Sequence, residues 1–85
     1  MKEAQYHVKS NGVIVSSGSI FHEDGKSLDS KAINAACALA AALGYLPSDV
    51  LIWRPRSDGK IVGAKRAEIK PRAKDGEPKY KAVSA

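Results

Sequence analysis

The sequence predicts an α+β fold: a single small domain with the order β-β-α-β-β, in which one alanine-rich helix packs on one face of an antiparallel sheet. Two observations predict the strands. The pairs Asn11-Gly12 and Asp58-Gly59 each separate β-prone runs, and such pairs are the strongest short-range signal for a β-hairpin. A third observation predicts the helix, because residues 30–43 carry apolar side chains at helical spacing. A chain of 85 residues is expected to form one domain.

The first hairpin is expected to join residues 4–10 to the run that starts at Val13. Both turn positions need positive φ, which Asn and Gly tolerate best. A turn at Asn11-Gly12 places Ser10 opposite Val13 and Val8 opposite Val15. One face of this hairpin is then predicted to join the core, and it carries Tyr6, Val8, Val13 and Val15.

The helix is expected to begin at Asp29 or Ser30, which are good N-cap residues, and to end before Gly44. Pro47 prevents it from continuing. After Asn34 the helix has no polar residue, so it lacks a conventional solvated face. Two interpretations stay open: the alanines allow the helix to lie close to the sheet, or a second subunit covers its outer side.

The second hairpin is centred on Asp58-Gly59, which places Ile52 opposite Lys65. This register gives a basic face that carries Arg54, Arg56 and Lys65. The other face is predicted to join the core, and it carries Leu51, Trp53, Pro55, Val62 and Ala64. Proline donates no ladder hydrogen bond, so the strand that contains it is expected at an edge or interrupted there.

The domain boundary is expected near Pro71. Residues 1–71 are predicted to form the compact domain. Residues 72–85 are charged, contain Gly and Pro, and show no periodicity, so they are predicted to be a basic, flexible C-terminal tail.

The cellular location is expected to be cytoplasmic. Cys37 is the only cysteine, which is typical of a reduced compartment. The N-terminal residues have no apolar segment of the kind found in signal peptides. The apolar run 35–43 is shorter than the roughly 20 residues that span a bilayer, so no membrane contact is expected.

Enzymatic chemistry is not expected from the motifs. Gly25-Lys26-Ser27 resembles the end of a phosphate-binding loop, but Ile20 stands where the loop needs its first glycine. Cys37 lies within the helix among alanines, which favours a packed thiol over a nucleophile. Two histidines and one cysteine, without metal-ligand spacing, predict no metal site, and no cofactor is expected.

Positive charge is concentrated late in the chain. Residues 51–85 contain ten of the fourteen Lys and Arg residues but only four of the nine acidic residues. Such asymmetry favours an anionic partner, and the fork-shaped arginine side chain suits phosphates. We therefore expect a non-enzymatic module that binds the phosphate backbone of DNA or RNA through the second hairpin and tail. The predicted contacts are Arg54, Arg56, Lys60, Lys65, Arg66, Lys70 and Arg72.

Other functions are consistent with the same charge. The protein is alternatively an interaction module, such as an inhibitor or adaptor that binds an acidic protein surface, or a structural homodimer. Stacking of bases on aromatic residues is not favoured, because Trp53 is assigned to the core and Tyr80 stands alone in the tail.

Overall fold

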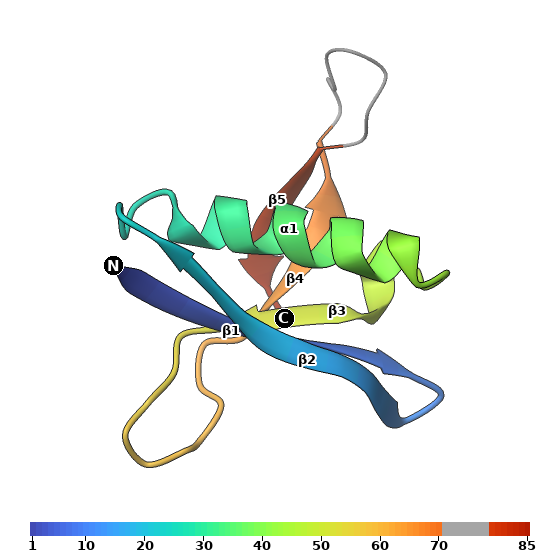
Figure 1. Cartoon of the computed structure of the whole chain (residues 1–85), viewed down its shortest axis with the longest axis horizontal. Coiled ribbons are helices and arrows are strands. Elements are labelled where there is room, and N and C mark those ends of the chain that lie inside the picture. The colour runs from blue at the N-terminus through green and yellow to red at the C-terminus, as the bar shows by residue number, and fades with distance from the viewer. Residues whose placement is uncertain (71–78) are drawn as a thin grey trace.

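The structure, a computed structural model, describes residues 1–70 and 79–85. It contains one helix, one short 3-10 segment and five strands (Figure 1). In chain order these are β1 (Lys2–Ser10), β2 (Val13–His22), α1 (Leu28–Ala42), η1 (Pro47–Asp49), β3 (Val50–Trp53), β4 (Lys65–Ile69) and β5 (Tyr80–Ser84).

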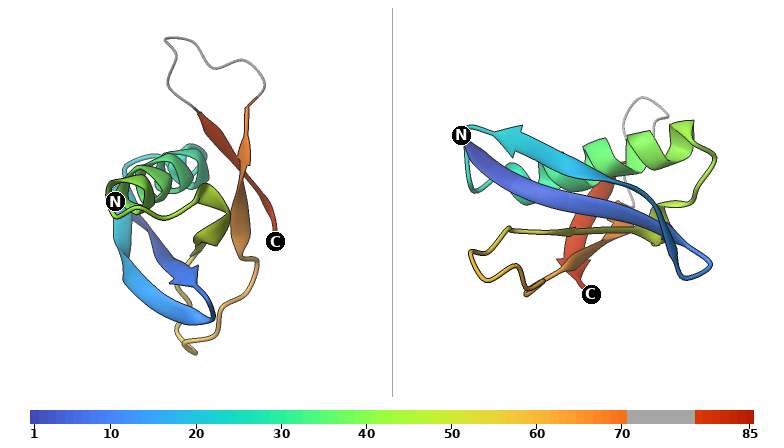
Figure 2. Two further views of the ribbon diagram at one scale, coloured as in Figure 1. Left: turned by 90° about the vertical axis from the view of Figure 1, so that its right-hand side faces the viewer. Right: turned by 60° about the horizontal axis from the view of Figure 1, so that its bottom comes forward.

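The strands form one antiparallel sheet in the order β2-β1-β3-β4-β5. Helix α1 lies across one face of this sheet, as the two views of Figure 2 show. The predicted α+β class and single small domain are confirmed. The sheet has one strand more than expected, because β5 pairs with β4 along its length.

The first hairpin has the predicted turn, with Asn11 at φ 53° and Gly12 at φ 78°. Ser10 pairs with Val13 as expected, but a register shift then places Val8 opposite Ser16 instead of Val15. Val13 and Val15 are 61% and 40% exposed, so their assignment to the core is wrong. The bulge explains the error for Val15, which the shifted register leaves without a partner, whereas Val13 keeps its predicted partner Ser10 and is exposed beside the turn.

Helix α1 packs its alanines directly against the sheet. Ala32, Ala36 and Ala40 are fully buried, together with Ile33. Short side chains at this spacing let the helix lie close to the strands. This agrees, for the inner side of the helix, with the interpretation that the alanines allow close packing on the sheet. The helix starts at Leu28 rather than at residue 30, because Leu28 is itself fully buried. Ser27 takes the N-cap position, and Asp29 lies in the first turn.

The second hairpin is shorter than predicted. Ile52 pairs with Lys65, as the Asp-Gly turn predicts, and Leu51 pairs with Arg66. The ladder stops there, so Arg54 and Arg56 have no cross-strand partners, and residues 54–64 form a loop. Pro55, which donates no hydrogen bond, lies directly after the end of β3.

The core side of β3 is the opposite of the predicted one. Val50 and Ile52 are buried, because they pair with Val8 and Tyr6 on the helix-covered face. Trp53 therefore lies on the open face of the sheet. Of the other residues that were assigned to the core, Leu51 and Ala64 are half-buried, and Pro55 and Val62 are exposed.

Strand β5 lies within the segment that was expected to be a tail. Its first residue is clamped to the helix, because the Tyr80 N–H donates to Asn34 Oδ1 and Asn34 Nδ2 donates to the Tyr80 carbonyl, both at 2.9 Å. Residues 80–84 thus belong to the sheet instead of to a flexible tail. The alternation of Tyr80, Ala82 and Ser84 is too short and too polar to predict this strand from the sequence.

Candidate nucleic-acid interface

Two of the predicted contact residues converge on one carboxylate at the start of α1. Arg54 Nε lies 3.0 Å from Asp29 Oδ1, and Lys65 Nζ lies 2.6 Å from Asp29 Oδ2. Arg54 Nη2 also donates to the Gly25 carbonyl at 2.8 Å. The expected proximity of Arg54 and Lys65 is observed, but an acid from another part of the chain binds both.

The ionisation of Asp29 reflects this environment. Partial burial is the largest influence and acts to raise its pKa. Hydrogen bonds from Lys65 and Arg54, together with their charges, outweigh it and hold the pKa of Asp29 below its usual value of 3.8. Asp29 is therefore a carboxylate at neutral pH. Its negative charge partly balances the positive charges of Arg54 and Lys65, which were predicted from the sequence to bind phosphate.

Two further predicted cations, Arg56 and Arg66, also contact acids. Arg56 forms two hydrogen bonds with Asp58, at 3.2 and 3.0 Å. The Lys60 N–H and then Arg56 lower the pKa of Asp58. Arg66 lies 3.7 Å from Glu68, which also binds Lys81 at 3.3 Å. We call these five ion-paired cations the paired group: Arg54, Arg56, Lys65, Arg66 and Lys81.

A second set of cations lies at a polar depression of about 370 Å³ on the helix side of the molecule. Lys31 comes from α1, Lys70 follows β4 and Lys79 precedes β5. The depression is completed by Ser27, Ser30 and Asn34. We call Lys31, Lys70 and Lys79 the lysine cluster. Within residues 1–70 and 79–85, no carboxylate lines the depression or pairs with these lysines.

The backbone holds the lysine cluster together. The Lys70 N–H donates to the Lys79 carbonyl at 2.8 Å, which places these two residues side by side. The Asn34 clamp on Tyr80 then brings both of them next to the first turns of α1, where Lys31 lies. Of the three, only Lys70 was predicted. Lys31 lies in the half of the chain with little excess charge, and Lys79 lies in the segment that was assigned to the tail.

The two other predicted contacts are Lys60 and Arg72. Lys60 is exposed in the 54–64 loop, and among the described acids none forms an ion pair with it. Arg72 lies outside the residues that the structure describes.

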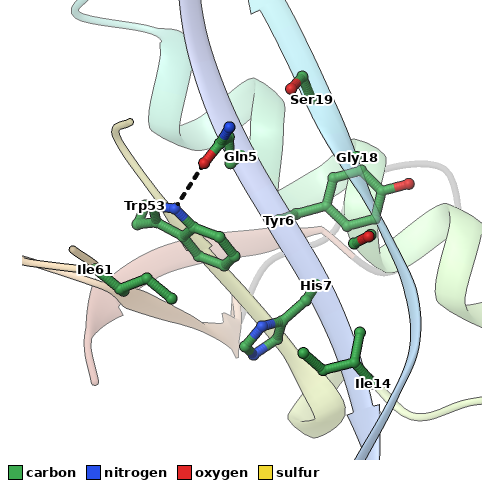
Figure 3. A pocket seen from close by; sticks show the side chains of 9 residues that line it. Gln5, Tyr6, His7, Ile14, Gly18, Ser19, Trp53 and Ile61 are labelled. Atoms are coloured by element: carbon green, nitrogen blue, oxygen red, sulfur yellow. Dashed lines mark hydrogen bonds between the residues drawn. The ribbon is translucent and has the colours of Figure 1, made fainter. Parts of the chain in front are cut away.

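The open face of the sheet carries a hollow of about 360 Å³ around Trp53 (Figure 3). The Trp53 indole N–H donates to Gln5 Oε1 at 3.0 Å, and the His7 ring meets the indole edge-on, with centroids 5.1 Å apart. Ile14 of β2 and Ile61 of the loop provide apolar walls. Partial burial, followed by the charge of Lys9, lowers the pKa of His7, so the imidazole is neutral at pH 7.

Cys37 is a packed thiol, as expected. It is 2% exposed, and burial raises its pKa to about 11. Among the described residues, no group of three or more His, Cys, Asp or Glu side chains is arranged to hold a metal ion. None of the described helices combines the length and the apolar character needed to cross a membrane.

Comparison with known proteins yields no relative: no family model, curated protein or solved structure matches this chain.

Proposed function

We propose that this protein is a small, non-enzymatic nucleic-acid-binding module that contacts mainly the phosphate backbone. The observation that carries the proposal is the lysine cluster, in which three cations from separate parts of the chain line one depression. The proposed contact set differs from the one expected from the sequence, because it retains Lys70 and adds Lys31 and Lys79.

The chemistry of the depression suits a phosphate group. Each lysine ammonium is a compact donor of three hydrogen bonds, and the Ser30 hydroxyl adds a neutral donor, whereas the Ser27 hydroxyl already donates to Asp24 Oδ2 at 3.2 Å. Lys31 also lies close to the start of α1, where the helix dipole favours an anion. Contacts of this kind fix a backbone in place but read no bases, so low sequence specificity follows.

The paired group has a supporting part in the proposal. Asp29 and Glu68 each bind two cations, so each of these clusters keeps one positive charge in excess. Together with the formal net charge of +5, these clusters attract a polyanion at long range. Action in the cytoplasm is part of the same proposal, and the single buried thiol of Cys37 suits that compartment.

The test is the salt dependence of binding to a labelled random-sequence duplex. Each phosphate contact contributes about 0.9 to the slope of log K against log salt concentration. We expect Lys70→Ala/Lys79→Ala to lower that slope by about 1.8. The matched control, Arg56→Ala/Lys81→Ala, removes the same charge from the paired group and is expected to lower it by less than about half as much.

Two results would count against the proposal. The first is wild-type protein that shows no salt-sensitive binding to the duplex. The second is an equal effect of the two double variants, which would mean that only net charge matters. Circular dichroism of all three proteins checks that the variants are folded.

A homodimer is a second candidate function, favoured by one observation on β2. This strand lies at the edge of the sheet, and residues 13–21 carry no charge. Val13, Ile14 and Phe21 are more than half exposed. An uncharged edge strand of this length is a template for pairing with another strand. Sedimentation of wild type and Val15→Lys tests this candidate: a dimer that the lysine abolishes supports it, and a wild-type monomer at high concentration contradicts it.

A further inference from the structure

We propose that the hollow around Trp53 on the open face of the sheet binds an unpaired nucleobase, so that the protein prefers single-stranded nucleic acid. This inference rests on the proposed function only in taking nucleic acid as the ligand. The hollow lies on the opposite face of the sheet from helix α1 and has different residues from the lysine cluster.

Strands β1 and β3 present polar and aromatic side chains on the open face of the sheet. Ala4, Tyr6 and Val8 are buried beneath the helix, so Gln5 and His7 lie on the other face. Gln5 pairs with Trp53 across the strands, which places these polar and aromatic side chains next to one another. Figure 3 shows Trp53 with Gln5, His7 and Ile61 around it.

The hollow combines an aromatic surface with hydrogen-bonding groups. The indole of Trp53 offers a flat surface for stacking, and base–aromatic stacking tolerates any base. The neutral His7 ring has one donor and one acceptor, and the Gln5 amide keeps its N–H groups while its oxygen accepts from Trp53. The Ser17 hydroxyl lies on the β2 side. A planar ring with polar edges matches this set better than an aliphatic side chain.

Charged side chains surround the hollow, and one of them is an acid, because Glu3 accepts from the lining Ser19 hydroxyl at 2.7 Å. Lys9 lies close enough to His7 to lower its pKa, and Lys60 precedes the wall residue Ile61 in the chain. Arg66 pairs with Leu51, which neighbours Trp53, and so also lies on the open face. Cations beside an aromatic surface are the usual combination for a single strand, because they hold the backbone while the base stacks. An acidic peptide lacks the ring that stacks, and an apolar peptide lacks the negative charge that the cations hold.

The experiment uses the fluorescence of Trp53, which is the only tryptophan of the chain. The full-length protein is titrated with a short oligothymidylate, with an abasic oligomer of equal length and charge, and with a duplex. We expect oligothymidylate to quench the emission and to bind about tenfold or more tightly than the abasic oligomer, since one stacked base typically contributes that much. The duplex, whose bases are paired, is expected to bind without quenching.

Two variants locate the effect. Ser17→Tyr fills the hollow from an exposed position of β2 and removes no interior contact. His7→Ala removes the ring that meets Trp53 edge-on. Ser17→Tyr is expected to bind oligothymidylate and the abasic oligomer equally well. His7→Ala keeps the Trp53 indole and is expected to lose only part of the preference for oligothymidylate. The anisotropy of labelled oligomers measures both effects.

The outcomes separate this inference from the proposed function. Equal binding of both oligomers without quenching overturns the base site and leaves phosphate binding intact. Absence of binding to any oligomer at low salt overturns both. Emission that changes with protein concentration alone, without nucleic acid, shows that a second copy occupies the hollow and overturns the base site.

Discussion

The paired group and the lysine cluster have similar side chains but different surroundings. Every cation of the paired group contacts a carboxylate, at distances between 2.6 and 3.7 Å. In the described part of the chain, the lysine cluster faces hydroxyl and amide groups and no acid. Of these two groups of described cations, the paired group, which holds the arginines, is therefore the one whose positive charge nearby acids partly balance.

This difference shows that charge counted along a sequence is not the charge that a ligand meets. A bound carboxylate must be displaced or shared before a phosphate can take its cation, and that exchange reduces the gain in free energy. A lysine that no acid contacts releases only water and counterions. The three lysines of the cluster, which no acid among residues 1–70 and 79–85 contacts, are therefore expected to contribute more to polyanion binding than the five cations of the paired group.

The largest expected effect on stability and binding comes from removing the Asn34 side chain, whose hydrogen bonds to Tyr80 hold the lysine cluster together. Asn34→Ala removes the two hydrogen bonds to Tyr80 and one to the Ser30 carbonyl. The free energy of unfolding is expected to fall by about 2 kcal/mol, because the backbone of Tyr80 loses partners in a half-buried place. Urea denaturation measures the loss.

Polyanion affinity is expected to fall in the same variant, because Lys79 is no longer held beside Lys31. Ser30→Ala serves as the control for stability alone, because its hydroxyl lines the depression. It leaves the Asn34 clamp in place, and its stability is expected to stay within about 0.5 kcal/mol of wild type. Unchanged stability and unchanged binding in Asn34→Ala would show that the clamp does not position the cluster.

The next effect comes from converting part of the paired group into unpaired cations. Asp29→Asn leaves Arg54 and Lys65 without their carboxylate. The free energy of unfolding is expected to fall by about 1 kcal/mol, a value kept low because both cations are partly solvated. Polyanion binding is expected to tighten, with a salt slope steeper by about 1.

The binding result is the decisive part of the Asp29→Asn experiment. Two released cations and the gain of one positive charge both favour a polyanion. If the affinity and the slope both stay at their wild-type values, the ion pairs do not limit the use of Arg54 and Lys65, and the distinction between the two groups fails.

The smallest effect is the pH dependence of Asp29. Its pKa is lower in the folded protein than in the unfolded chain, so the unfolded chain binds the proton more readily. The stabilisation from Asp29 is therefore fully present above the usual value of 3.8 and is lost as pH falls through the lower, folded pKa. The difference in stability between wild type and Asp29→Asn should stay constant near neutral pH and narrow below about pH 4. A difference that grows on acidification would have the wrong sign.

The local features of the fold could be predicted from the sequence. The turn at Asn11-Gly12, the helix before Gly44 and the pairing of Ile52 with Lys65 are confirmed. Each depends on residues close together in the chain, whose conformational preferences act before any tertiary contact forms.

The errors concern features that distant residues decide. The face of β3 that joins the core is set by its pairing with β1, which places Ile52 rather than Trp53 under the helix. Strand β5 depends on Asn34, which is 46 residues away from Tyr80 in the chain. The ion pairs of Asp29 span 25 and 36 residues. No local pattern reports such contacts, so both the lysine cluster and the hollow around Trp53 were missed.

The most direct measurement is a map of amide chemical shifts while a short DNA duplex, whose paired bases are not expected to stack on Trp53, is added to the isotopically labelled protein. The central claim predicts the largest shifts, removed by high salt, at Ser27, Lys31, Asn34, Lys70 and Lys79. It predicts small shifts at Arg54, Arg56 and Asp58. The reverse pattern, with the hairpin arginines shifting most and the lysine cluster unchanged, would contradict the account.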